Sequence, residues 1–172
     1  MNILKTLLAL ACLWPLLAQA EPAAAMKIAS PDFPEGGMIP ARFTCDGTNV
    51  NPRLDITGVP AGARSLVLIV DDPDAPAGTW NHWLLWNIDP GTTKIAAGAV
   101  PSGAVQGRSD FGQEKYIGPS PPSGTHRYFF RLLALDAKLD LPAGADRAAL
   151  ETALRGHILM RAELMGRYRR SP

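Results

Sequence analysis

A segment rich in carboxylates is the first candidate for chemistry. Residues 71–76 are Asp-Asp-Pro-Asp-Ala-Pro and directly follow a continuous apolar run at 66–70. The two prolines fix their own φ angles and restrict the residues before them. The segment is therefore stiff, and at least one carboxylate is held in a defined direction. The alternative is a solvated turn, because Asp-Pro pairs are common in turns.

Two of the three histidines in the chain lie next to similarly constrained segments. His82 stands among tryptophans in the segment 80–83, and His126 follows the proline-rich turn 119–124. Taken alone, His82 is compatible with a core imidazole that is satisfied by one hydrogen bond. His126 alone is compatible with a turn followed by an edge strand.

A carboxylate and two imidazoles together would form a compact polar site. Asp72 can accept hydrogen bonds, and His82 and His126 can donate to an anion when suitably tautomerised or protonated. This combination suits a phosphomonoester that carries an amine or a hydroxyl. A metal-dependent hydrolase that uses the same three residues is the enzymatic alternative. The sequence contains no Gly-x-Ser-x-Gly motif and no His-Glu-x-x-His motif.

The elements that must position these residues are mostly strands. The run 66–70 is apolar throughout and rich in β-branched residues, which predicts a strand buried on both faces. Asp146 is a suitable N-cap for a helix to about Arg155, and Gly156 interrupts that helix. We expect six or more strands and one or two helices, including strands at 26–30, 66–70, 82–88, 126–135 and 157–165, a helix at 146–155, and long loops at 31–60 and 89–124.

The composition indicates an ordinary folded domain. The chain has 172 residues, 47% of them hydrophobic and 19% charged, with 17 Lys+Arg against 16 Asp+Glu. This composition excludes a disordered chain. A net charge near zero argues against a nucleic-acid partner and against a polybasic membrane-surface protein. The 16 glycines and 16 prolines favour a turn-rich, strand-rich fold.

The N-terminus has the pattern of a signal peptide. Lys5 precedes a short apolar run at 6–17, and an Ala-Gln-Ala motif ends at Ala20, where we expect cleavage. The mature protein is then periplasmic or secreted, and no later stretch approaches the ~20 apolar residues of a transmembrane helix. A membrane anchor and a lipoprotein lipidated at Cys12 are the alternatives. Cleavage leaves Cys45 without a disulfide partner, which predicts a small buried hydrophobe.

Six short segments in a fixed order form a larger pattern. They are Cys45-Asp46-Gly47-Thr48-Asn49-Val50-Asn51-Pro52, Asp72-Pro73-Asp74-Ala75-Pro76, Trp80-Asn81-His82, Asp110-Phe111-Gly112, Tyr116-Ile117-Gly118 and Pro121-Pro122-Ser123-Gly124-Thr125-His126-Arg127-Tyr128. Together they resemble the phosphatidylethanolamine-binding protein family, also called Raf kinase inhibitor proteins, and above all its small bacterial branch. Any one segment alone would be a weak match, whereas the ordered set is specific.

The resemblance implies a β-sandwich in a single domain at 26–169, with a large antiparallel sheet on a smaller sheet and one or two peripheral helices. It also implies a small surface pocket for anions such as phosphate, acetate or phosphoethanolamine. The pocket residues of the family correspond here to Asp72, His82, Pro121, Pro122 and His126, with Tyr116 at the rim. Ser120 departs from the pattern, because many bacterial and archaeal members carry cysteine at that position.

The leading interpretation is a non-enzymatic, exported binding protein. Its pocket would take a small anionic ligand or a phospholipid head group, without a cofactor or a resident metal. A protein-interaction or inhibitor module with a vestigial pocket is the alternative from another class, and it implies a protein partner. A homodimer is left open. Kinase inhibition does not follow, because the chain lacks the long insertion that eukaryotic members have between the Asp-Pro-Asp segment and the paired histidine.

Overall fold

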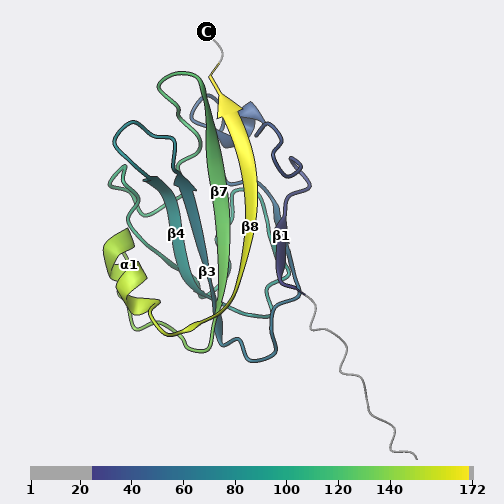
Figure 1. The fold of residues 1–172 in the computed structure, drawn as a ribbon, viewed down its shortest axis with the longest axis vertical. Helices are drawn as coiled ribbons and strands as arrows, with labels where there is room; N and C mark the ends of the chain where they lie inside the picture. The colour runs from purple at the N-terminus through teal and green to yellow at the C-terminus, as the bar shows by residue number, and fades with distance from the viewer. Residues whose placement is uncertain (1–24, 171–172) are drawn as a thin grey trace, which may run out of the picture.

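The computed structural model describes residues 25–170, which form two antiparallel sheets and one α-helix (Figure 1). The elements are, in chain order, β1 (Lys27–Ala29), the 3-10 helix η1 (Ala41–Phe43), β2 (Leu54–Thr57), β3 (Ser65–Asp72), β4 (Trp80–Ile88), β5 (Lys94–Ile95), β6 (Val105–Gln106), β7 (Thr125–Leu135), α1 (Arg147–Ala153) and β8 (Ile158–Arg169). The predicted sandwich of a large sheet on a smaller one, with a peripheral helix, is confirmed.

The larger sheet has the strand order β6-β4-β3-β7-β8, and the smaller has the order β1-β2-β5. The long strands β7 and β8 pair along their whole length, from Thr125 opposite Arg169 to Leu135 opposite Ile158, and lie side by side in Figure 1. β3 lies between β4 and β7, and all eight of its residues are buried. The continuous apolar run in the sequence follows from this central position.

Two hydrophobic clusters lie on opposite faces of the larger sheet. Leu68 and Val70 of β3 point into the cluster between the sheets. Val67 and Ile69 point to the outer face and pack with Leu150 of α1. This alternation is that of a strand covered on both sides, and it fixes which face each later residue of β3 occupies.

The helix begins where the sequence predicts. The Asp146 side chain accepts a hydrogen bond from the Ala149 backbone N–H at 3.0 Å, so the predicted N-cap is confirmed. The helix ends at Ala153 rather than Arg155, and Gly156 follows with a φ of +81°. Such a φ favours glycine. The chain then turns into β8, the predicted final strand, which runs on to Arg169.

Three expectations about local structure need correction. Asp71 and Asp72 belong to β3 rather than to the loop after it, because β4 and β7 continue to pair beyond Val70. The predicted loop at 31–60 contains η1 and the strand β2, and the predicted loop at 89–124 contains the short strands β5 and β6. Cys45 is only partly buried, and its Sγ lies 3.5 Å from the Asp46 carboxylate, so the prediction of a buried hydrophobe is wrong.

The predicted signal peptide at 1–20 lies outside the described residues. Within residues 25–170, no helix is long and apolar enough to span a membrane.

Candidate functional site

The end of β3 places two carboxylates on opposite faces of the larger sheet. Side chains alternate along a strand, so Asp72 follows Val70 to the inner face and Asp71 follows Ile69 to the outer face. Both side chains are buried. One sheet end therefore carries two separate polar networks, and only the inner one includes the predicted site residues.

The inner network is built on a carboxylate–imidazole pair. The Nδ1 atom of His126 lies 2.8 Å from the Asp72 Oδ2 atom, and the residues are only 7% and 3% exposed. The other carboxylate oxygen of Asp72 accepts the Asp74 backbone N–H at 2.9 Å. Both oxygens thus have donors, which holds the carboxylate and the His126 ring in fixed orientations.

His82 reaches the same face through a β-bulge. Val70 pairs with Trp83 and the next residue, Asp71, pairs with Asn81, so His82 is the extra residue on β4. Its ring packs edge-on against the inner-facing Tyr128, with centroids 5.3 Å apart. The bulge therefore places an imidazole beside the Asp72 network, where regular strand alternation would not.

The His82 ring is oriented by one backbone hydrogen bond. Its Nδ1 atom lies 2.7 Å from the carbonyl oxygen of Ile117, which can only accept. Burial lowers the pKa of His82 below its ordinary value, although the Ile117 carbonyl and the Asp72 charge act in the opposite direction. The ring is consequently neutral at neutral pH, with its hydrogen on Nδ1.

A pocket of about 270 Å³ opens beside these side chains. Its polar wall includes Asp72 and His82, and the remaining wall is largely apolar. The lining residues are Asp72, Ala75, Pro76, Ala77, Trp80, His82, Phe111, Ser120 and Pro122. The pocket combines a few polar groups with aromatic and proline surface, which is typical of small-ligand sites.

Two buried polar atoms in this region have no hydrogen-bond partner among the described residues. They are the Nε1 atom of Trp80, which belongs to the pocket wall, and the hydroxyl of Tyr128. Burial raises the pKa of the Tyr128 hydroxyl, and the Asp72 charge adds to this effect. Leaving a buried donor unpaired is unfavourable, and both atoms are enclosed by the protein rather than exposed to the pocket.

Comparison with known proteins assigns the chain to a family. The model of the phosphatidylethanolamine-binding protein family matches residues 29–169. The chain belongs to this family. It is 50% identical over 150 residues to the UPF0098 protein of Methanothermobacter thermautotrophicus, a match that covers 84% of this chain and 99% of the relative.

Two solved structures of this family's homologues have the same fold. A phosphatidylethanolamine-binding protein homologue from Chlamydia trachomatis gives a TM-score of 0.82 at 41% identity, covering 86% of this chain and 99% of that one. Escherichia coli YbcL, described as a new member of the mammalian family, gives a TM-score of 0.81 at 31% identity, covering 86% and 100%.

The structure distributes the residues implied by the family resemblance over three environments. Asp72, His82 and Pro122 line the pocket, and His126 is hydrogen-bonded to Asp72. Pro121 is buried but is not among the lining residues. Tyr116 is not among them either: its hydroxyl donates to the Phe43 carbonyl at 2.9 Å, and its ring packs on Trp83 in the core.

Phe111 is one of the pocket residues that reasoning from residue types missed. It is 38% exposed and packs edge-on against Trp80 and His82, with centroids 5.6 and 5.3 Å away. It belongs to the Asp110-Phe111-Gly112 segment of the family pattern, which was the available signal. A large apolar side chain left exposed at a pocket mouth is a natural contact for a ligand.

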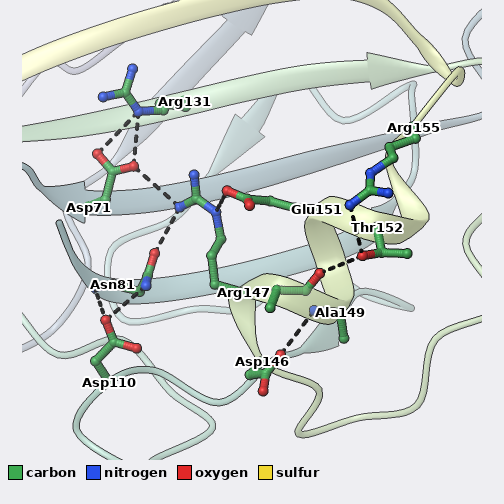
Figure 2. A network of polar contacts seen from close by, with 11 residues as sticks. Asp71, Asn81, Asp110, Arg131, Asp146, Arg147, Ala149, Glu151, Thr152 and Arg155 are labelled. Carbon is green, nitrogen blue, oxygen red and sulfur yellow. Dashed lines mark hydrogen bonds and ion pairs between the residues drawn. The ribbon is translucent and has the colours of Figure 1, made fainter.

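The Phe111 loop is anchored by a network on the outer face of the sheet. The Asp110 carboxylate accepts both the backbone N–H of Asn81, at 2.7 Å, and its side-chain amide, at 2.8 Å. Figure 2 shows Arg147 of α1 reaching Asn81, Asp71 and Glu151. The outer carboxylate Asp71, which also accepts from Arg131, thus belongs to the structural support of the pocket wall.

The loop after β3 is held in a similar way. Asp74 forms a bidentate ion pair with Arg127 at 2.6 and 2.9 Å and also accepts the Arg127 backbone N–H. These hydrogen bonds hold the pKa of Asp74 down at about 2. Asp74, the second aspartate of the Asp-Pro-Asp segment, therefore positions the loop. Asp72, the first aspartate, lines the pocket.

The hydrolase alternative requires a metal held by Asp72, His82 and His126. Within residues 25–170, no group of three His, Cys, Asp or Glu side chains is arranged to hold a metal ion. Instead, His126 is directed at Asp72 and His82 at a backbone carbonyl.

Proposed function

We propose that this member of the phosphatidylethanolamine-binding protein family is an exported binding protein whose pocket holds the phosphate-type head of a small ligand. The observation that carries the proposal is the buried Asp72–His126 pair beside a pocket that His82 also lines. Burying such groups opposes stability unless they are fully paired. Their concentration at one pocket is therefore typical of a functional site.

The polar groups of the pocket allow only a low affinity for a head group that carries no apolar part. Each charge-assisted hydrogen bond contributes roughly 1.5–3 kcal/mol, and association costs at least ~4 kcal/mol. Three such bonds leave a small surplus, which corresponds to a dissociation constant of about millimolar. Tighter binding needs an apolar part of the ligand that packs on Trp80 and Phe111 at the pocket wall.

Export places this function in the periplasm or outside the cell. The proposal of export rests on the sequence of residues 1–20. This segment has a positively charged residue near its start, a short apolar core, and a cleavage motif with small residues on both sides of one variable residue. Mass spectrometry of the mature protein tests it directly. We expect Glu21 at the N-terminus, and an N-terminus at Met1 would contradict export by cleavage.

Calorimetric titration tests the binding function. We expect the metal-stripped protein to bind inorganic phosphate and O-phosphoethanolamine, and His126→Ala to abolish binding. His157→Ala is the matched control, because His157 forms the same 2.8 Å Nδ1–carboxylate contact with Asp136 on the exposed surface. The absence of binding by the wild-type protein would refute the proposal.

A second candidate is a protein-interaction module, favoured by a broad groove elsewhere. The groove measures about 990 Å³ and lies between α1 and the outer face of β7 and β8. Its charged lining residues are Arg131, Arg147, Arg155, Arg161, Asp71, Glu151 and Glu163, and its apolar lining includes Ile69, Leu133, Leu154 and Ile158. Partner capture that is lost in Arg161→Glu and retained in His126→Ala would favour this function over the pocket.

A further inference from the structure

Strand β8 forms one edge of the larger sheet, and only part of this edge is covered (Figure 1). Near the end of β8, the segment 36–39 of the same chain lies against the strand. The Arg167 backbone N–H donates to the Gly37 carbonyl at 2.7 Å, and the Arg167 carbonyl accepts the Ile39 N–H at 2.7 Å. Met38 and Arg167 form a parallel β-bridge there. The second half of the edge is therefore already paired.

The first half of the edge is open. In an antiparallel strand, the N–H and C=O of one residue point to the same side, and those of the next residue point to the other side. The backbone groups of Arg167 point away from β7, and the register of β7 with β8 is regular from Met160 to Arg169. The backbone groups of Arg161 and Glu163 therefore also point away from β7. Among residues 25–170, nothing outside the sheet forms a hydrogen bond with these four groups.

The side chains on the open half divide between the two faces of the sheet. Arg161 pairs with Leu133, which belongs to the outer cluster, so Arg161 and Glu163 lie on the outer face. Met160 and Ala162 lie on the inner face, partly buried against the core between the sheets. A free edge of this kind can pair with an extended chain. A row of unpaired N–H and C=O groups is matched best by another main chain, which favours a polypeptide over a lipid or a small anion.

The charges decide which polypeptide fits. Glu163 is already paired with Arg131 of β7. Arg161 is exposed and has no carboxylate partner among the described residues, and the same holds for Arg155, which follows α1. Both arginines line the groove beside α1, whose other charged groups form ion pairs with one another. The uncompensated charge next to the open edge is thus positive. An acidic side chain opposite Arg161 is favourable there, and a basic one is unfavourable.

We infer that the open edge of β8 binds an extended, acidic segment of a partner polypeptide, which adds a strand to the larger sheet beside Arg161 and Glu163. The inference rests on the second candidate function, the protein-interaction module, and names the chemistry of its partner. The anion pocket takes no part in this contact.

The experiment measures the binding of labelled peptides to the full chain by fluorescence anisotropy. The probe is Val-Asp-Val-Asp-Val, whose valines favour an extended strand and whose aspartates share one face. Val-Lys-Val-Lys-Val has the same shape and the opposite charge. We expect the aspartate peptide to bind at least roughly fivefold more tightly, because a like charge opposite Arg161 replaces an attraction by a repulsion.

Two methylated probes test whether the main chains pair. Alternate N–H groups of a strand face the same neighbour, so methylation of the aspartate nitrogens removes one set and methylation of the valine nitrogens removes the other. We expect one of these probes to lose binding and the other to retain it. Binding by both would overturn strand addition, because a contact made only by side chains does not need either set.

Substitutions locate the contact. Arg161→Glu should weaken binding of the aspartate peptide at least roughly fivefold and improve binding of the lysine peptide. Arg108→Glu is the matched control, because Arg108 is exposed, has no carboxylate partner among the described residues and follows β6 at the opposite edge of the sheet. Equal losses in the two variants would overturn the inference. Thermal unfolding verifies that both variants are folded.

The remaining outcomes separate this inference from the functions proposed above. Loss of peptide binding in His126→Ala would overturn it, because the aspartates would then occupy the anion pocket. Self-association of the protein, measured by light scattering and lost in Arg161→Glu, would overturn it in favour of pairing between two copies of β8. Partner capture that depends on Arg161 without any binding of the aspartate peptide would reject strand addition and keep the interaction module.

Discussion

Replacing Asp72 by asparagine tests whether the buried pair depends on a charged acceptor. The two oxygens of Asp72 accept from two N–H groups, those of His126 and the Asp74 backbone. An asparagine of the same shape has one oxygen and one NH₂ group. Turned one way, the Asn NH₂ group faces the Asp74 backbone N–H and leaves a buried donor unpaired. Turned the other way, it faces His126 Nδ1 and requires the ring to move its hydrogen to Nε2. In either orientation Asp72→Asn removes the charge of the buried acceptor.

The expected loss follows from that conflict. A buried donor left without an acceptor destabilises a protein by roughly 1–3 kcal/mol. For a chain of this length, each kcal/mol lowers the melting temperature by about 2–4 °C. Urea unfolding followed by tryptophan fluorescence measures the change in the free energy of unfolding, and calorimetry should show loss of phosphate binding in the same variant.

Asp136→Asn is the control for this prediction. Asp136 bonds to His157 at the same 2.8 Å, but both side chains are nearly half exposed. Water can satisfy the groups left unpaired there, so we expect a loss below about 1 kcal/mol. Equal losses in the two variants, or unchanged stability and phosphate binding in Asp72→Asn, would refute the reasoning.

Three further predictions concern the frame around the pocket. Because bonds to Arg127 lower the pKa of Asp74 to about 2, their stabilising effect is complete above the unfolded pKa, near 4, and is lost as the pH falls towards 2. Asp74→Asn should therefore flatten acid unfolding between these values, and an unchanged profile would contradict this. Asp146→Ala removes the cap of α1 and should lower the free energy of urea unfolding by about 1 kcal/mol, whereas no change would argue against the cap. A Cβ on Gly118 would overlap the carbonyl oxygen of Phe43, so Gly118→Ala should lower the melting temperature by several degrees, and a wild-type value would contradict that packing.

Local patterns were sufficient to predict the central strands and the helix. The apolar run 66–70 needed burial on both faces, and only a central strand offers this. Asp146 was a typical N-cap before a periodic apolar segment. These features depend on neighbours in the sequence, so the residues themselves were enough.

The geometry of the site depends on contacts that no local pattern contains. His82 enters the pocket region because a bulge shifts the pairing of β4 with β3, and the sequence alone does not show strand register. Asp71 and Asp72 looked like one acidic loop, yet strand alternation separates them onto two faces. The family pattern implied Asp72 and His126 as site residues, whereas reasoning from residue types gave only their capacity to form a joint polar site.

Imidazole nitrogen NMR during a phosphate titration tests the central claim most directly. The chain has only three histidines, so three rings account for the whole spectrum. We predict that phosphate shifts the signals of His82 and His126, the rings at the pocket and its buried pair, and leaves surface His157 unchanged. Signals of His82 and His126 that stay fixed at saturating phosphate would contradict the account.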